Sequence, residues 1–261
     1  MNKTEQTPAP VSPEVSGLQS PATALWRYVG LMVLAGLPLV FLADNPYWLN
    51  IIAFTYLMAG LASAWNIIGG FGGQFSLGHG VFFGIGAYAT AFFTTRYGLS
   101  PWLITVPAAL VAAIVAMLIS WPTFRLRGPF FAIATMAFNE VAFVLANHFD
   151  TYTGGPRGIM IPFKAGFANM IFRERWQYAV LMFVFVALVI AISVWLRRSR
   201  LGYYLLAVRE DEDSARASGI NVLRVKLQGM ALSAFLTAIG GTLFTMYLRF
   251  IDPPTLFTLQ D

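Results

Sequence analysis

Residues 197–226 read RRSRLGYYLLAVREDEDSARASGINVLRVK, a charged stretch that separates two long apolar runs. It contains seven of the 17 Lys and Arg residues of the chain. A basic stretch beside hydrophobic segments is typical of a cytoplasmic loop, because positively charged loops stay on the cytoplasmic side of the membrane. This stretch therefore predicts the orientation of every other segment.

The same stretch has the pattern of two short helices. Apolar residues at the spacing of one helical face predict a first helix along the membrane surface: Leu201, Tyr204, Leu205 and Val208. Acidic residues favour the start of a second helix, which Arg216 and a left-handed Gly219 would end. We interpret the segment as a docking surface for a cytoplasmic partner, with these candidate residues: Arg209, Glu210, Asp211, Glu212, Arg216 and Gly219.

The composition indicates a membrane protein. Of the 261 residues, 57% are hydrophobic and 11% are charged, whereas a typical soluble domain has about 25% charged residues. The alternating pattern of a β-barrel is absent, so we predict an all-α polytopic fold. The chain has no cysteine and two histidines, so we expect no metal site and no cofactor.

Seven apolar runs approach the roughly 20 residues that a helix needs to cross a membrane. They are 25–42, 48–68, 77–94, 101–121, 130–147, 176–196 and 227–248. Residues 1–23 carry four prolines and no apolar periodicity, which predicts a disordered tail ahead of a membrane domain at 24–261. This tail is not a signal peptide, because the apolar run after it is too long for a cleaved segment.

Charge counting gives the orientation. With residues 197–226 inside the cell, 11 of the 17 Lys and Arg residues lie inside and 6 lie outside. This predicts a cytoplasmic N-terminus and an external C-terminus. The external segment 148–175 contains a turn cluster at 153–158 and is interpreted as a structured lid, a re-entrant hairpin or an exposed loop.

The densest run of glycine lies at 69–88. Frequent glycine frees the backbone from regular helix, and irregular backbone within a membrane is tolerated where it lines a water-filled route or packs against protein. Glu140 is expected near the middle of the bilayer, where a carboxylate needs a partner or a proton. We interpret six residues as candidates for a substrate route: Ser76, His79, Gly84, Thr135, Asn139 and Glu140. The alternatives are simple helix packing for the glycines and a structural hydrogen bond for Glu140.

An enzyme is not expected. Ser76 could in principle pair with a histidine, but no G-x-S-x-G motif surrounds it, and no nucleotide-binding G-x-x-x-x-G-K-[ST] motif occurs in the chain. If ATP drives the protein, another subunit must bind it. In the last apolar run, Ser233, Thr237 and Gly241 recur every four residues and predict a helix-packing stripe.

Four stretches together resemble the LivM-type permeases of branched-chain amino-acid ABC transporters. They are FSLGHGVFFGIGAY at 75–88, RLRGPFFA at 125–132 followed by Thr135, Phe138 and Glu140, TGGPRGI at 153–159, and AVREDE at 207–212 with GIN at 219–221. The resemblance covers residues 48–257. Permeases of urea and of short-chain amides are similar at the same places.

The resemblance implies a permease that works with a LivH-like permease, two cytoplasmic ATPases and a periplasmic binding protein. The charged segment would be its coupling helix. The chain departs from the family at Asp213 and Ser214, where small residues are usual. The family also continues beyond residue 261 with at least one more span, so we expect a C-terminal truncation that leaves the Ser233 stripe uncovered.

From these observations we expect an inner-membrane permease subunit that imports branched-chain amino acids with ATP hydrolysed by its partners. A urea or short-chain amide permease is the first alternative. A proton-coupled secondary transporter, with Glu140 carrying the proton, is the second.

Overall fold

The computed structural model describes residues 21–41, 45–126 and 128–257 of the chain. The α-helices are α1 (Pro21–Phe41), α2 (Pro46–Asn66), α3 (His79–Tyr97), α4 (Pro101–Thr123), α5 (Pro129–His148), α6 (Asp150–Thr153), α7 (Arg175–Arg198), α8 (Arg200–Glu210), α9 (Glu212–Ala217), α10 (Val222–Leu248) and α11 (Pro253–Phe257). The shorter elements are the π-helix η1 (Ile67–Phe71), the 3-10 helices η2 (Gly155–Arg157) and η3 (Phe167–Asn169), and the strands β1 (Ile159–Met160) and β2 (Phe250–Ile251).

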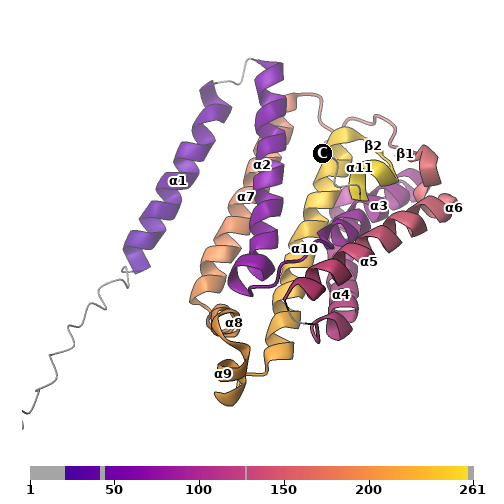
Figure 1. Ribbon diagram of the computed structural model, residues 1–261. Coiled ribbons are helices and arrows are strands. Elements are labelled where there is room, and N and C mark those ends of the chain that lie inside the picture. Colours follow the sequence, from indigo (N-terminus) through magenta and orange to yellow (C-terminus); the bar gives the residue numbers. More distant parts are fainter. Residues whose placement is uncertain (1–20, 42–44, 127, 258–261) are drawn as a thin grey trace, which may run out of the picture.

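Helix α10 lies at the centre of the bundle. It packs against α2 on one side and against α3 and α4 on the other (Figure 1). Helix α7 packs against α2, and α1 contacts α7. In the most apolar 18-residue stretch of α10, 67% of the residues are buried, compared with 33% or less in the other spanning helices. Small residues make this central position possible, because helices in a membrane gain stability from close packing rather than from hydrophobic burial.

The contact between α3 and α10 is close enough to need glycine on both helices. A Cβ atom on Gly86 would lie 1.9 Å from the carbonyl oxygen of Ala238, and one on Gly241 would lie 2.1 Å from the carbonyl oxygen of Phe83. Both distances are far below van der Waals contact. The two backbones therefore touch directly.

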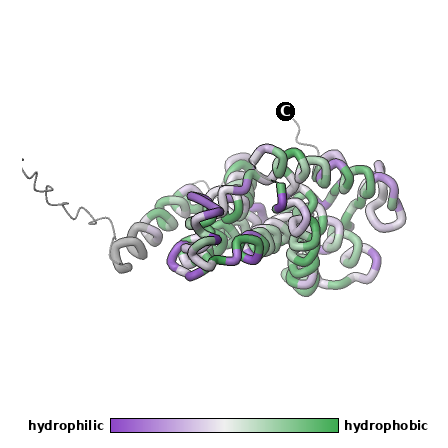
Figure 2. Tube along the Cα trace, turned by 60° about the horizontal axis from the view of Figure 1, so that its bottom comes forward, coloured by the Kyte–Doolittle hydropathy of each residue, from purple (hydrophilic) through white to green (hydrophobic). Residues whose placement is uncertain are grey.

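Among the described residues, five helices are long and apolar enough to cross a membrane: Pro46–Phe71, Pro101–Thr123, Pro129–His148, Arg175–Arg198 and Val222–Leu248. Helices also occupy the other two predicted positions. The described apolar part of α1 is the shorter segment Gly30–Phe41, and α3 has 19 residues. Figure 2 shows that the helices are largely hydrophobic and that hydrophilic residues gather near their ends. The protein is thus a polytopic helical membrane protein.

In the charged stretch 197–226, the two spanning helices extend further than the sequence indicates. Helix α7 extends into it to Arg198, and α10 begins within it at Val222, so the loop between the spanning helices is shorter than predicted. The two predicted short helices are present as α8 and α9. Glu210, predicted at the start of the second helix, instead ends α8, because Asp211 is the N-cap of α9.

Other features of this stretch agree with the prediction. Leu205 and Val208 on the predicted apolar face of α8 are buried against the bundle, whereas Tyr204 is exposed. Gly219 has a φ of +82°, the left-handed conformation predicted for the end of α9. Its amide donates to the carbonyl of Arg216, so the turn that separates α9 from α10 is closed by a backbone hydrogen bond.

The segment 148–175, predicted to lie outside the cell and called the external cap below, is folded into short elements. It contains α6, η2 and η3, and its strand β1 pairs with β2 in an antiparallel register of Ile159 with Ile251. Helix α5 ends and α7 begins on the same face of the molecule (Figure 1). The segment is thus held against the end of α10.

At both ends of the described chain, residues predicted to lie in a tail are folded. Residues 21–23, predicted in the disordered tail, belong to α1, whereas the rest of that tail lies outside the described residues. Residues 250–257, predicted as part of a short external tail, form β2 and then α11, which turns back against α3 and α5. Pro253 starts this helix rather than only ending α10, because proline is tolerated in the first turn of a helix.

The small-residue stripe of α10 is buried within the chain. Ser233 and Thr237 are 0% and 3% exposed, and the Ser233 hydroxyl donates to the carbonyl of Ala64 on α2 at 2.7 Å. Gly241 contacts α3 as described above. The stripe is a packing surface as predicted, but the expectation that it stays uncovered is wrong, because α2 and α3 cover it.

Candidate functional site

The glycine-rich segment contains a break in regular helix, as predicted. Helix α2 continues into η1, the backbone is irregular at 72–78, and α3 starts at His79. Side chains from other parts of the chain form hydrogen bonds with the polar groups of this irregular backbone. The Trp65 Nε1 donates to the Ser76 carbonyl at 2.7 Å, and the Leu77 amide donates to the Thr135 hydroxyl at 3.0 Å. A helix broken inside a membrane is stable only with such partners.

His79 lies in a buried chain of hydrogen bonds. Its Nε2 is 2.9 Å from the Ser233 hydroxyl, and its Nδ1 is 3.2 Å from the Ser76 hydroxyl. Because Ser233 gives its only hydroxyl proton to the carbonyl of Ala64, it accepts from His79. His79 therefore carries its proton on Nε2 and accepts from Ser76 on Nδ1. Through Ser76 and Ser233 this chain of hydrogen bonds joins the irregular segment 72–78, α3, α10 and α2.

Ser76 and Thr135 also line a small cavity between α3, α4, α5 and α10. The cavity is small, about 10 Å³, which is room for about one water molecule. Its other walls are largely apolar, formed by residues that include Val81, Phe82, Ile119, Phe138 and Met230. Ser120 completes the lining, and its hydroxyl is buried without a hydrogen-bond partner in the described residues. Apolar walls with a few convergent polar groups are typical of small-molecule sites.

The structure separates Asn139 from Glu140 although they are adjacent in sequence. Asn139 points into the bundle, where its Nδ2 donates to the carbonyl of Phe257 on α11 at 2.8 Å. Gly80 and Gly84 make room for this contact, because a Cβ atom there would meet the Asn139 amide oxygen and the Phe257 ring. Gly84 thus packs against α11 in this chain.

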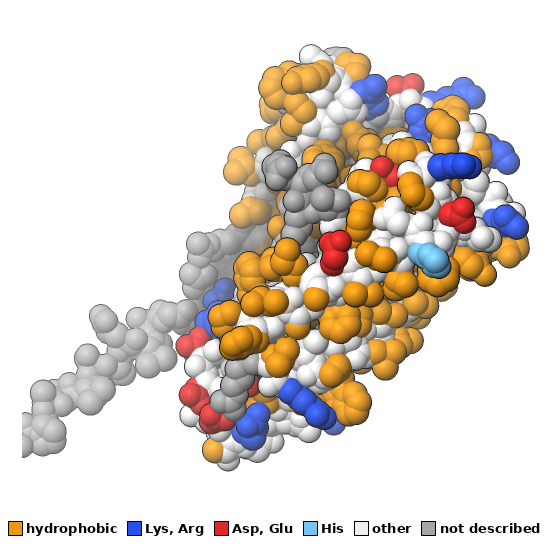
Figure 3. Space-filling view, turned by 45° about the vertical axis from the view of Figure 1, so that its right-hand side comes forward, with side chains coloured by type: hydrophobic (Ala, Val, Ile, Leu, Met, Phe, Trp, Pro, Cys, Tyr) orange, Lys and Arg blue, Asp and Glu red, His pale blue; other side chains and the backbone are white. Residues whose placement is uncertain are grey.

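Glu140 lies on the exposed side of α5, near the middle of the helix. Large apolar side chains are exposed on the same helix, including Ile133, Met136 and Val144. Figure 3, which views the α5 side of the molecule, shows hydrophobic side chains spread over this face with few charged ones among them. The predicted burial of Glu140 is therefore wrong for the chain alone.

The docking candidates lie together at the opposite end of the bundle from the external cap (Figure 1). Arg209 donates from Nη1 to the carbonyl of Gly70 at 3.0 Å and pairs with Glu210 at 2.6 Å. The end of α8 is thereby bonded to the start of the broken segment. Arg216 pairs with Asp213 on the surface of α9 at 3.4 Å.

Two acidic residues fix the start of α9. The amide of Ser214 donates to the Asp211 carboxylate, which holds the pKa of that carboxyl below its usual range. Glu212 forms an ion pair with Lys226, whose side chain is 2% exposed. The ammonium of Lys226 also lies 5.7 Å from the centre of the Phe124 ring. Sequence reasoning placed Lys226 in a solvated loop and missed this buried link.

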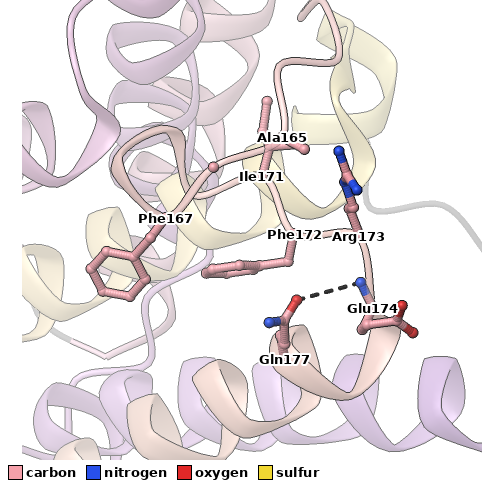
Figure 4. Close-up of a pocket in the computed structure, with 8 residues that line it drawn as sticks. Ala165, Phe167, Ile171, Phe172, Arg173, Glu174 and Gln177 are labelled. Carbon is pink, nitrogen blue, oxygen red and sulfur yellow. Dashed lines mark hydrogen bonds between the residues drawn. The ribbon is translucent and has the colours of Figure 1, made fainter.

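The external cap holds two further hollows that sequence reasoning did not predict. One is lined by the segment 165–167 and by residues 171–174 and 177, with Phe167 and Phe172 among them (Figure 4). The second shares Phe172, Arg173 and Glu174 with it and has a volume of about 400 Å³. No group of three or more His, Asp or Glu side chains in the described part of the chain could hold a metal ion.

Comparison with known proteins places these features in a family. The family described as branched-chain amino acid transport system / permease component matches residues 47–260. The high-affinity branched-chain amino acid transport system permease protein LivM of Escherichia coli (strain K12) is 31% identical over 233 residues, which are 80% of this chain and 54% of that relative. The chain thus spans about half the length of this relative. No solved structure matches.

More distant relatives carry related names. The probable branched-chain amino acid transport permease protein LivM of Methanocaldococcus jannaschii is 26% identical over 145 residues, 54% of this chain and 40% of that relative. The permease protein LivH of the high-affinity system of Salmonella typhimurium is 23% identical over 216 residues, 74% of this chain and 68% of that relative.

Proposed function

Because this chain belongs to the family of permease components of branched-chain amino acid transport systems, we propose that it is a permease subunit of an ABC importer for branched-chain amino acids. In this proposal it lies in the bacterial inner membrane with its N-terminus in the cytoplasm. It works with a LivH-like permease, two cytoplasmic ATPase subunits and a periplasmic binding protein. The chain itself is a transport subunit and not an enzyme.

The exposed position of Glu140 carries the proposal. A charged side chain at the centre of a bilayer costs about 2.5–3.5 kcal/mol on insertion scales, so it normally faces protein or water. Glu140 projects from the middle of α5 to the outside of this chain. This supports a second permease subunit on the α5 face, with a hydrated substrate route between the two subunits.

The interior of the bundle supports a route beside this face. The broken segment before α3 and the cavity lined by Ser76, Ser120 and Thr135 lie directly behind α5. The cavity is too small for a substrate in this conformation, about 10 Å³, but its hydroxyl groups and apolar walls would suit an aliphatic amino acid once the helices around it separate. Asn139 and α11 lie next to it and could open it by moving.

The charged hairpin of α8 and α9 supports the ATPase partner. Its acidic and basic side chains are largely exposed, for example Glu210 at 71% and Arg216 at 58%. Its inner side is bonded to Gly70 and to Lys226. A movement of the hairpin would therefore reach the broken segment and α10 together.

A proton-coupled secondary transporter is the second candidate, because an exposed carboxylate within a membrane helix could carry a proton. Glu140 supports this reading as well. The two candidates differ in the source of energy, and a urea or short-chain amide permease differs in the substrate.

Uptake in cells tests all three. The chain is expressed with its partner genes, and uptake of labelled leucine, urea and acetamide is measured. We expect leucine uptake that disappears when the partner ATPase loses its nucleotide-binding lysine. Uptake that persists without the ATPase and collapses with the proton gradient would replace the proposal by the secondary transporter. Uptake of urea or acetamide instead of leucine would show that the protein is a permease for that compound.

A further inference from the structure

The second external hollow lies at the face opposite α8 and α9. It is bounded by the first turns of α2 and α7, by the end of α10 and by the external cap, through residues that include Asn50, Arg175, Arg249 and Phe163. Its volume of about 400 Å³ leaves room for a small molecule.

Three arginines line this hollow: Arg173, Arg175 and Arg249. None of them pairs with a carboxylate of the described residues. The acidic residue in the lining is Glu174, the N-cap residue of α7. External segments of inner-membrane proteins are usually poor in arginine, so three unpaired guanidinium groups around one hollow call for a ligand with negative charge.

The backbone at Arg249 gives a second, independent indication. Arg249 has a φ of +59° at the end of α10, a left-handed conformation that glycine adopts more easily. Gly98 fills the equivalent position at the end of α3, with a φ of +66°. An arginine in such a position indicates a role for its side chain. That side chain is half-buried, and its guanidinium lies 5.0 Å from the centre of the Phe163 ring.

The rest of the lining is mixed in polarity. The Tyr247 hydroxyl donates to the Asn50 side chain at 3.0 Å, which fixes both groups beside Arg249. Phe163 and Phe172 add aromatic surface. In Figure 4, Phe172 and Arg173 leave the segment in different directions, so the aromatic and basic groups separate along it.

We propose that this hollow binds a zwitterionic aliphatic amino acid at the outer face of the membrane. The arginines, with Arg249 at their centre, bind the α-carboxylate through charge-assisted hydrogen bonds. Glu174 attracts the ammonium group, and the aromatic rings contact the aliphatic side chain. The choice of an amino acid rests on the proposed function. An acidic protein surface or a lipid phosphate would use the arginines but would have no use for Glu174.

Binding of L-leucine to the full chain in phosphatidylcholine nanodiscs tests the proposal, measured by saturation-transfer NMR. Arg249→Gln should weaken binding about tenfold or more, the loss expected for a charge-assisted hydrogen bond. Arg249→Gly keeps the left-handed backbone without the side chain, so it should fold at least as well and bind equally weakly. The control Arg96→Gln removes an arginine at the last turn of α3, outside this lining, and should bind like the unaltered chain.

Two leucine analogues distinguish the groups that are recognised. 4-Methylpentanoate keeps the carboxylate and should compete with leucine, whereas 3-methylbutylamine lacks it and should not. Equal binding by the unaltered chain and both Arg249 variants would overturn the proposal. So would absence of leucine binding, including the case in which phosphatidylglycerol or an acidic binding protein occupies the hollow.

ATP-driven leucine uptake by the same variants separates this inference from the proposed function. Intact uptake without leucine binding at the hollow would refute the proposed binding site and leave the proposed importer function in place. Leucine binding that depends on Arg249, in a protein without ATP-driven uptake, would support the binding site and refute the proposed importer function.

Discussion

At the scale of single residues, Lys226 is the most informative side chain. It is buried at the start of α10, where Glu212 neutralises it and the Phe124 ring faces it. Phe124 in turn stacks on Phe131 with ring centres 5.1 Å apart. One ammonium therefore connects α9, α10 and the turn between α4 and α5.

We predict that Glu212→Gln destabilises the chain by up to about 3 kcal/mol, because it leaves the Lys226 charge buried without a partner. The double variant Glu212→Gln with Lys226→Met should recover most of the loss, since the unpaired charge is gone. Thermal unfolding in detergent measures both. The control is Glu210→Gln, which breaks an exposed ion pair and should have a small effect. A double variant as unstable as the single one would contradict the role of the buried charge.

A second prediction at this scale concerns the cavity hydroxyl of Ser120. The chain has no cysteine, so Ser120→Cys gives one reactive thiol. We expect an aqueous thiol reagent to modify it during ATP-driven transport and much more slowly at rest. Ala109→Cys, which is on the same helix but in the apolar core, should stay unmodified in both conditions. Equal protection of the two thiols during transport would show that the cavity is not on the substrate route.

At the scale of helices, the contact between α3 and α10 depends on glycine. We predict that Gly86→Ala destabilises the bundle by about 1–3 kcal/mol, the usual cost of overpacking, because its Cβ would clash with the Ala238 carbonyl. Gly30→Ala is a matched control, since α1 has open space around Gly30. Thermal unfolding of both variants checks this. Equal melting temperatures would mean that the helices separate at little cost.

The positions of the helices were predictable because their signals are local. Each long apolar run became a helix within a few residues of its predicted ends, and the Asp211 cap and Gly219 stop follow from residue type. The pairing of β1 with β2 and the return of α11 to α5 were not predictable. They depend on contacts between residues about 90 to 120 positions apart, for example Ile159 with Ile251 and Asn139 with Phe257.

The same limit applies to the candidate site. The glycine run and the His79 region were found from composition, since glycine and a membrane histidine stand out in an apolar sequence. Ser120 gave no signal, because a lone serine in an apolar helix usually bonds to its own backbone. Burial of Lys226 and exposure of Glu140 depend on which helix faces which neighbour. A one-dimensional pattern does not contain that information.

At the scale of the whole molecule, the two ends of the bundle differ in what they carry. The end with α8 and α9 holds Arg197, Arg198, Arg200, Arg209 and Arg216, and the other end holds the folded cap and the arginine-lined hollow. The positive-inside rule assigns the first end to the cytoplasm. If this assignment were reversed, the hollow would face the cytoplasm and could not receive a substrate from outside.

Single cysteines at the two ends test the orientation. Ser218→Cys follows α9, and Lys164→Cys lies in the external cap, where Lys164 is exposed and forms no ion pair with the described residues. In intact spheroplasts, a membrane-impermeant maleimide should label Lys164→Cys and leave Ser218→Cys unlabelled until the membrane is opened. The reverse pattern would place α8 and α9 outside. It would then exclude both an ATPase on that hairpin and an amino acid entering through the hollow, because each needs its own side of the membrane.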